Sequence, residues 1–266
     1  MTAPPRKHVP RRQTGSTTRA GPRRRRAPLT RERVLQAAIQ LADQGGLASV
    51  SMRNLGQELG VEAMAFYHHF ANKDEVLDGV VDLVFSEIAL PDPGRDWKGA
   101  MRARAISVQD ALMRHQWAIG LMESRRNPGP ANLRHHDAVI GSLLAGGFTM
   151  AMAGHAYSLL DSYIYGFALT KMNLPFRTEE EVADVARTML EPFPANEYPS
   201  LVAFITHHAM KPGYDYGDEF GYGLDLILDG LDRARSIADG GANELDAANV
   251  GRTDGTGRAT TVQAKP

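Results

Sequence analysis

Two short helices separated by a tight turn are predicted by the stretch SMRNLGQELGVEAMAFYHHF, residues 51–70. Ser51 is a typical N-cap, and apolar residues follow it at the spacing of one helix face: Met52, Leu55 and Leu59. Gly60 stands where a left-handed residue ends a helix, so we expect helices over Ser51–Leu59 and Glu62–Phe70. This arrangement matches a helix-turn-helix, whose second helix enters a DNA major groove, but an ordinary helical hairpin has the same spacing.

Helices are also expected on both sides of this stretch. Thr30 can cap a helix that carries apolar residues at helical spacing and ends at Gly45-Gly46. Asn72 can cap another, over Lys73–Leu90, which the prolines at 91 and 93 interrupt. Residues 30–80 are therefore predicted to form a three-helix DNA-binding head, with the helix over Lys73–Leu90 leading out of it.

The helical pattern continues through the rest of the chain, and no alternating strand pattern of useful length appears. The expected helices cover Asp96–Ser124, Ala131–Ala145, Thr149–Met172, Thr178–Leu190, Glu197–Met210 and Asp218–Ala238. The predicted fold is all-α, with the helix-turn-helix head linked by a connecting helix to a larger helical domain for ligand binding and dimerisation. Its expected parts are a disordered basic arm (1–29), the head (30–80), the ligand-binding and dimerisation domain (81–240) and a flexible tail (241–266).

The head resembles the TetR family of bacterial transcriptional regulators from about Thr30 to Val80. The resemblance is carried by RNLGQELGVE at 53–62, FYHHF at 66–70 and NKDEVL at 72–77. It implies DNA contacts by Arg53, Ala63, Met64, Ala65, Tyr67 and His69, with Lys73 on a phosphate. The family often has alanine at the position of Gly56, and a glycine there should weaken its helix by up to about 1 kcal/mol.

The side-chain chemistry of these residues suggests which part of the DNA each of them can contact. Arg53 can grip a guanine with two hydrogen bonds, whereas the two alanines and Met64 offer only apolar contact, such as with a thymine methyl. Tyr67 and His69 can reach phosphates or base edges, although Tyr67 can instead be mainly packed. Ser51 can satisfy either a backbone amide or a phosphate oxygen.

Charge is divided unevenly along the chain. The 266 residues carry a net charge of −1, but residues 1–29 hold nine Lys and Arg and no acid, so the remainder carries −10. Residues 30–80 carry four basic and seven acidic residues, a net charge of −3, although they are the predicted DNA reader. We hypothesise that the arm, including Arg23, Arg24, Arg25 and Arg26, supplies phosphate attraction; a solvated tail that contributes nothing is the alternative.

The larger domain shows a second, looser resemblance, over roughly Trp97–Ala238. The segment LDSYIYGFAL at 160–169, followed by LPF at 174–176, is similar to the ligand-binding domain of tetracycline-repressor-like members of the family. The resemblance implies a homodimer that binds a palindromic double-stranded DNA operator and a small-molecule effector. We expect Asp218–Ala238 and Ala131–Ala145 to form the intersubunit bundle, unless they complete the core of the monomer instead.

Adaptable, aromatic and polar side chains suggest where an effector binds. The candidates are His115, Trp117, Met122, Met152, His155, Asp161, Tyr165 and Met172. Each of them singly also fits an ordinary core position. Members that bind tetracycline as a magnesium chelate have histidines where our approximate alignment places Ile88 and Met122, so we expect a largely apolar or aromatic effector.

Other classes of protein find little support. The chain has no cysteine, which excludes disulfides, thiolate zinc sites and thiol nucleophiles. It has no H-E-x-x-H, G-x-S-x-G, Walker A or Rossmann motif, so we predict no catalytic residue, metal or cofactor. The alternatives left are a non-specific nucleic-acid-binding helical module driven by the Arg-rich arm and, less favoured, a helical enzyme. No secretory signal or membrane span is recognisable, so a cytoplasmic protein that does not bind membranes is expected.

Deleting residues 1–26 tests the role of the arm. Every phosphate contact that is lost should reduce the slope of log affinity against log salt by about 0.9, because fewer counterions are then released. Affinity for a bound duplex is measured for both chains over a salt series. An unchanged slope contradicts the hypothesis.

Overall fold

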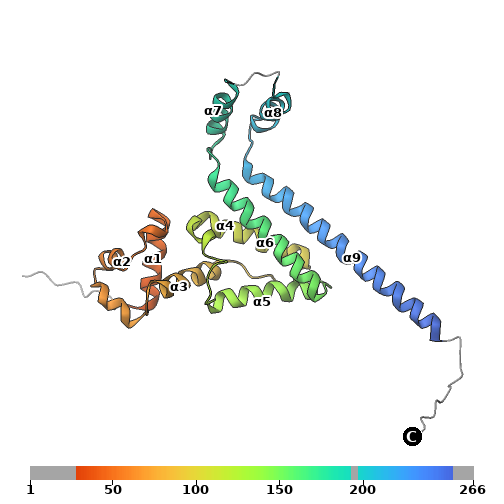
Figure 1. Ribbon diagram of the computed structural model, residues 1–266, viewed down its shortest axis with the longest axis horizontal. Helices are drawn as coiled ribbons and strands as arrows, with labels where there is room; N and C mark the ends of the chain where they lie inside the picture. Colours follow the sequence, from red (N-terminus) through yellow and green to blue (C-terminus); the bar gives the residue numbers. More distant parts are fainter. Residues whose placement is uncertain (1–27, 193–196, 254–266) are drawn as a thin grey trace, which may run out of the picture.

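The computed structural model describes residues 28–192 and 197–253, with side chains as far as residue 237, and over these ranges it is helical without strands (Figure 1). This confirms the all-α prediction. The α-helices are α1 (Arg31–Gly45), α2 (Met52–Leu59), α3 (Lys73–Ser86), α4 (Trp97–Arg114), α5 (Pro130–Ala145), α6 (Met150–Asn173), α7 (Glu179–Leu190), α8 (Pro199–Phe204) and α9 (Glu219–Thr253). Shorter turns of helix are η1 (Leu47–Ser49), η2 (Ala63–His68), η3 (Gln116–Gly120), η4 (Ile205–Ala209) and η5 (Tyr216–Asp218).

The predicted helix ends of the head are confirmed by their caps. Thr30, Ser51 and Asn72 each accept a hydrogen bond from the backbone amide three residues on, over 3.2, 3.1 and 2.9 Å. Gly60 adopts the left-handed conformation expected of it, with φ of +65°. Local sequence signals therefore fix both where α1, α2 and α3 begin and where α2 ends.

The second helix of the predicted helix-turn-helix differs from the expectation. Instead of an α-helix over Glu62–Phe70, the structure has the 3₁₀ segment η2, over Ala63–His68. Its bonds span three residues, from the Ala65 amide to Glu62 and from the His69 amide to Phe66, each near 2.9 Å. Six residues that include a Phe, a Tyr and a His have modest helix propensity, and such short runs often adopt the tighter form.

Several other helix ends also differ from the prediction. The connecting helix α3 ends at Ser86, short of Leu90, and the helix expected over Asp96–Ser124 stops at Arg114, where His115 leaves helical geometry and η3 follows. The helix expected over Glu197–Met210 is split into α8 and the π-helical η4, while α9 continues past Ala238 to Thr253.

Good helix formers explain the extension of α9, because alanine, glutamate and leucine follow its Gly-Gly pair at 240–241. Part of the expected flexible tail, up to Thr253, is thus helical, while residues 254–266 lie outside the described ranges. Most of the basic arm, residues 1–27, also lies outside them.

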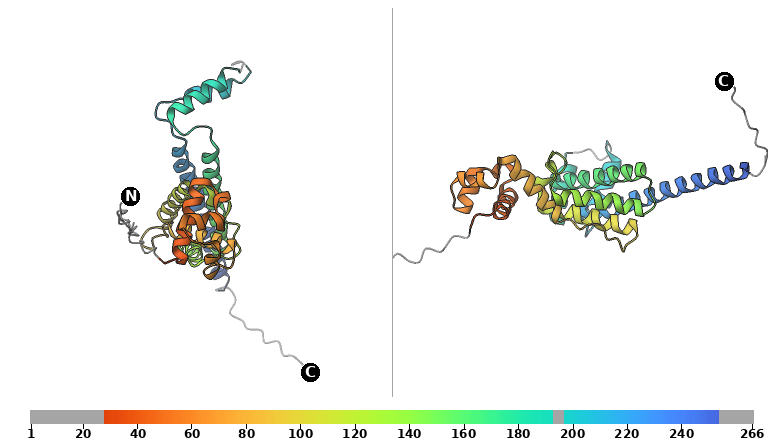
Figure 2. Two further views of the ribbon diagram at one scale, coloured as in Figure 1. Left: turned by 90° about the vertical axis from the view of Figure 1, so that its left-hand side faces the viewer. Right: turned by 90° about the horizontal axis from the view of Figure 1, so that it is seen from below.

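Two hydrophobic cores share one helix. The head core joins α1, α2 and η2 to Val76 and Val80 of α3, whereas Val81, Val84 and Phe85 of the same helix belong to the core of the larger domain, or body. The head therefore sits at one end of α3 and the body at the other, as Figures 1 and 2 show.

The body is a helical bundle in which α4, α5 and α6 pack on one another and α9 packs along α4 and α6. Figure 1 shows α6 and α9 side by side, and the right-hand view of Figure 2 shows the end of α9 extending past the other helices. None of the helices among the described residues is long and apolar enough to cross a membrane.

Gly56 is explained by close packing rather than by weakness of its helix. A Cβ atom at this position would lie 2.8 Å from the carbonyl oxygen of Val61, in the turn of the helix-turn-helix. That carbonyl belongs to the backbone, so the turn itself would have to move. The glycine thus allows α2 and the turn to approach closely.

Alanine substitutions at Gly56 and Gly141 distinguish the effect of close packing from the effect of helix propensity on stability. Gly56→Ala should lower the free energy of unfolding, because the clash outweighs the better helix propensity of alanine. Gly141→Ala, in the middle of α5, should raise it by up to about 1 kcal/mol, because the added Cβ would have no side chain or other segment within 4 Å, apart from the two chain neighbours and the backbone of α5 itself. Denaturant unfolding measures both, and equal stabilisation by the two substitutions would contradict the close-packing account.

Candidate functional site

The exposed side of η2 carries unusually large apolar side chains. Met64 is 73% exposed and Tyr67 is 53% exposed, whereas Phe66 between them is buried in the head core. Arg53, in the first turn of α2, is also exposed, and so is Lys73 at the start of α3. The structure thus brings these predicted DNA contacts to the surface on neighbouring elements of the head.

The remaining predicted DNA contacts are less exposed, are already hydrogen-bonded or lie outside the described residues. Ala63, Ala65 and His69 are half-buried, and the Ser51 hydroxyl accepts the amide of Asn54 as a helix cap. Ser51 can still donate its own hydroxyl proton to a phosphate. The arm residues Arg23, Arg24, Arg25 and Arg26 lie outside the described residues.

A small polar network fixes the turn between η2 and α3. Arg31 of α1 donates to the His69 carbonyl over 2.8 Å and to the Glu75 carboxylate over 2.6 Å, and its guanidinium lies 4.3 Å from the centre of the Phe70 ring. Glu75 in turn accepts the Ala71 amide over 2.7 Å. These hydrogen bonds, that from Ala71 first, lower the pKa of Glu75. The network holds the end of η2 at a set position on the head.

The charges of the head leave little attraction for DNA. Arg31 is paired with Glu75, and Arg33 donates to the Pro28 carbonyl over 2.6 Å. Within the described part of the head, only Arg53 and Lys73 are cations without such a contact. Among the predicted DNA contacts of the described head, Arg53 and Lys73 are thus the two cations that can attract phosphate.

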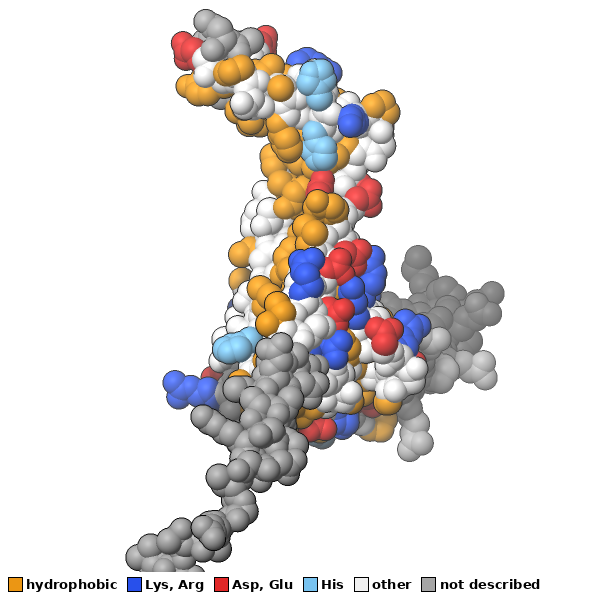
Figure 3. Space-filling model, turned by 90° about the vertical axis from the view of Figure 1, so that its right-hand side faces the viewer, with side chains coloured by type: hydrophobic (Ala, Val, Ile, Leu, Met, Phe, Trp, Pro, Cys, Tyr) orange, Lys and Arg blue, Asp and Glu red, His pale blue; other side chains and the backbone are white. Residues whose placement is uncertain are grey.

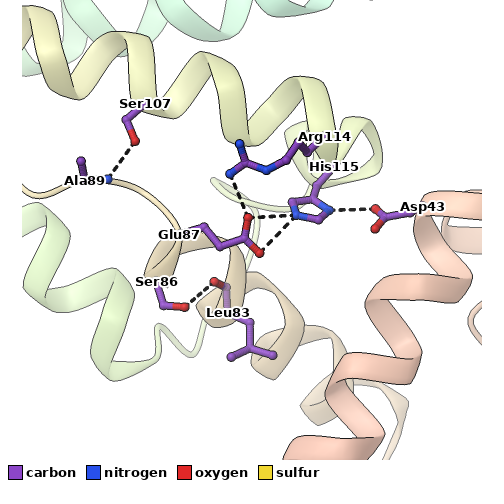
Figure 4. Close-up of polar contacts among 8 residues, drawn as sticks. All are labelled: Asp43, Leu83, Ser86, Glu87, Ala89, Ser107, Arg114 and His115. Carbon is purple, nitrogen blue, oxygen red and sulfur yellow. Dashed lines mark hydrogen bonds and ion pairs between the residues drawn. The ribbon is translucent and has the colours of Figure 1, made fainter.

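The head and body meet at a polar junction, drawn in Figure 4. His115, where α4 ends, points one ring nitrogen at Asp43 of α1 over 2.8 Å and the other at Glu87 after α3 over 3.1 Å. Trp117 donates its indole N–H to the same Asp43 oxygen over 2.7 Å, and Arg114 donates to Glu87 over 2.9 Å. Since both acceptors of His115 are carboxylates, a doubly protonated ring can donate to both at once.

The predicted effector residues fall into two groups and one outlier. His115, Trp117 and Met172 belong to the junction, where the last two line a cleft of about 570 Å³ between α1, α4 and α6. Met122 and Met152 pack in or against the body core, and Asp161 and Tyr165 lie at its polar centre, described next. His155 is exposed on α6, apart from both groups, and its predicted contact with an effector stays a prediction.

A charged cluster lies inside the body, where three helices converge. Arg104 of α4 is 1% exposed, and a terminal nitrogen of its guanidinium lies 2.6 Å from the carboxylate of Asp161 on α6. Its Nε donates to Nε2 of His135, a buried residue of α5, over 3.2 Å. Burial, followed by the charge of Arg104, lowers the pKa of His135 to about 3, so this ring is neutral near pH 7.

Two tyrosines border this cluster. Tyr165 donates its hydroxyl to Glu123 over 3.0 Å, and the Arg104 guanidinium lies 6.0 Å from the centre of the Tyr157 ring. Burial, followed by the negative charge of Asp161, raises the pKa of both Tyr157 and Tyr165. Both hydroxyls therefore stay protonated and act as donors beside the carboxylate.

Sequence reasoning missed Arg104 and His135. A signal was present for Arg104, because it shares a helix face with Met101, Ala105 and Val108, all of them buried. An arginine on the apolar face of a helix indicates a buried partner. The partner itself, Asp161, lies two helices further along the chain and no local pattern connects the two.

Together, an all-α head with an exposed helix-turn-helix and a helical body with a polar centre define the class of ligand-regulated DNA-binding proteins. Comparison with known proteins agrees with this class. Residues 34–80 match the model for bacterial regulatory proteins of the tetR family, and residues 90–235 match that for the tetracyclin repressor-like C-terminal domain. The chain belongs to the tetR family of bacterial transcriptional regulators.

Named proteins from other bacteria are similar to this chain over most of its length. The HTH-type transcriptional repressor DrrR1 of Streptomyces coeruleorubidus is 31% identical over 227 residues, 82% of each chain. The tetracycline repressor protein class C of Escherichia coli is 27% identical over 212 residues, which cover 78% of this chain and 92% of the repressor. Among solved structures, apo ActR of Streptomyces coelicolor has a TM-score of 0.66 at 28% identity, covering 80% of this chain and 99% of ActR. ActR in complex with actinorhodin has a TM-score of 0.65 at 29% identity, covering 79% and 99%.

Proposed function

We propose that this regulator is a repressor that binds a palindromic operator as a homodimer and is released by a small, largely apolar or aromatic molecule bound in its body. The observation that carries the proposal is the exposure of Met64 and Tyr67 on a head whose other large apolar side chains are mostly buried. The name of the relative DrrR1 supports repression, and the complex of ActR with actinorhodin supports an effector in the body. Neither a non-specific module nor an enzyme is favoured. We place the protein in the cytoplasm, where the operator DNA of a bacterium lies.

The route from effector to DNA follows α3. A ligand that prefers one packing of the body shifts the population toward it, and α3 carries this change to the head because its side chains belong to both cores. The contacts of His115 and Trp117 with Asp43 link α4 to α1 in parallel. Two heads held at a set spacing then lose their register with two half-sites about 34 Å apart.

The dimer surface that we propose lies on α6 and α9 rather than on α5 and α9, the pair expected from the sequence. All three helices bury one face in the monomer, and on α5 two of the three large exposed apolar side chains, Ile140 and Leu144, are only 37% and 36% exposed. On α6 and α9 the large exposed apolar side chains are all at least 46% exposed: Met150, Leu159, Leu169, Tyr222, Leu226 and Ile237. Figure 3 shows hydrophobic side chains running along this side of the molecule beside a group of charged residues. Burying such a face against its own copy forms a four-helix interface.

Selection of bound duplexes from random DNA tests the proposed function. We expect the wild-type chain to recover one palindromic sequence with two half-sites, and Arg53→Ala combined with Tyr67→Ala to lose this enrichment. Both side chains are exposed, so the free energy of unfolding should change by less than about 1 kcal/mol. Recovery of no preferred sequence by the wild type, or of the same one by the variant, would contradict the proposal.

The dimer surface is tested by charged substitutions with a matched control. Leu159→Glu combined with Leu226→Glu should give a monomer, because four carboxylates would be buried in the proposed interface. Leu133→Glu, on the exposed side of α5, should remain dimeric. Light scattering after size-exclusion chromatography gives the mass of each. A monomeric control together with a dimeric double variant would instead place the interface on α5.

A further inference from the structure

We propose that Arg104 and His135 form the anion-binding end of the effector site, and that the effector is an aromatic carboxylate. This inference rests on the proposed function, since it names the chemical class of the effector. The observation behind it is a set of buried polar atoms without hydrogen bonds in the described part of the chain: both terminal nitrogens of Arg104, Nδ1 of His135 and both carboxylate oxygens of Asp161.

The unpaired atoms on Arg104 and His135 are all donors. Because Nε of Arg104 donates to Nε2 of His135, the single proton of the neutral ring is on Nδ1. The terminal nitrogens of Arg104 carry four N–H groups, and the contact of one of them with Asp161 at 2.6 Å is an ion pair without hydrogen-bond geometry. Two buried side chains on α4 and α5 thus lack acceptors, which a ligand with two neighbouring oxygens can supply.

A carboxylate fits these donors better than a neutral carbonyl. A guanidinium is permanently charged and matches the two oxygens of a carboxylate with parallel hydrogen bonds. Asp161 is the counter-ion of Arg104, and a ligand carboxylate would exchange with it. The hydroxyl group of Tyr157 stays protonated next to Asp161 and can donate to it after the exchange, whereas Tyr165 already donates to Glu123.

Rings around the cluster indicate the aromatic part of the ligand. The rings of Phe85, His136 and Tyr157 succeed one another, with centroids 5.7 Å and 5.5 Å apart, and Phe85 also lies 5.4 Å from His135. A planar ring system bound at the cluster would meet this row by edge or face contacts. Since Phe85 belongs to α3, a ligand that displaces His135 acts directly on the helix that holds the head.

The experiment compares a carboxylate with its neutral isostere on the full-length protein. Calorimetry is used to titrate 2-naphthoate and 2-naphthamide, which differ in charge but hardly in shape. We expect Kd for 2-naphthoate to be at least tenfold lower. Equal affinities, or no binding of either compound at millimolar concentration, would overturn the inference.

Two double variants locate the preference. Arg104→Met with Asp161→Leu replaces the buried pair by apolar side chains, a change that proteins often tolerate without loss of stability, and it should reduce the preference to less than twofold. Lys98→Met with Asp229→Leu removes another ion pair of α4, that with α9, on the protein surface, and should leave the preference at tenfold. Thermal unfolding verifies that both variants are folded. A tenfold preference that survives in the first variant overturns the assignment to Arg104.

The results of these experiments distinguish a failure of this inference from a failure of the proposed function. If DNA selection recovers an operator but no carboxylate preference appears, the regulator stands and the inference about its effector fails. If 2-naphthoate binds with the expected preference while no operator is found, the site stands and the proposed function fails. If 2-naphthoate changes the operator affinity of the wild type but not that of Arg104→Met with Asp161→Leu, the carboxylate site is the effector site of the regulator.

Discussion

The sharing of α3 between two hydrophobic cores is the constraint on which the rest of the molecule depends. Val80 is the last buried residue of this helix in the head core, and Val81, its neighbour, is the first buried residue in the body core. At Gly79 the helix lies so close to α1 that a Cβ would come within 2.6 Å of Leu35. Because close-packed interiors transmit displacement rather than absorb it, α3 cannot shift in the body without moving the head.

Polar contacts decide how this apolar connection can move. Asp43 receives both the ring of His115 and the indole of Trp117, and Arg125 reaches back from the body to Asp78 of α3 over 2.5 Å. These contacts tie the head to α4 and to the loop before α5. A rearrangement of the body that moves the head would therefore have to break or exchange these hydrogen bonds.

Local signals predicted the parts of the fold that depend on neighbouring residues. The caps at Thr30, Ser51 and Asn72 and the left-handed Gly60 were all readable, because each is satisfied within a few residues. The short 3₁₀ form of η2 was not, because six residues of modest helix propensity do not decide between the two forms of helix. The polar centre of the body was missed for a different reason: its partners come from α4, α5 and α6, and only packing brings them together.

The buried pair of Arg104 and Asp161 is better understood as part of a site than as a source of stability. Removing two charges from water costs free energy that their attraction recovers only with good hydrogen bonds, and most of the polar atoms of this pair lack them. Apolar side chains of similar size would fill the same space at less cost. A ligand that supplies acceptors to the buried donors would therefore gain free energy of binding from them. That gain is specific to the ligand-bound packing, which is the difference in affinity needed to shift the position of α3.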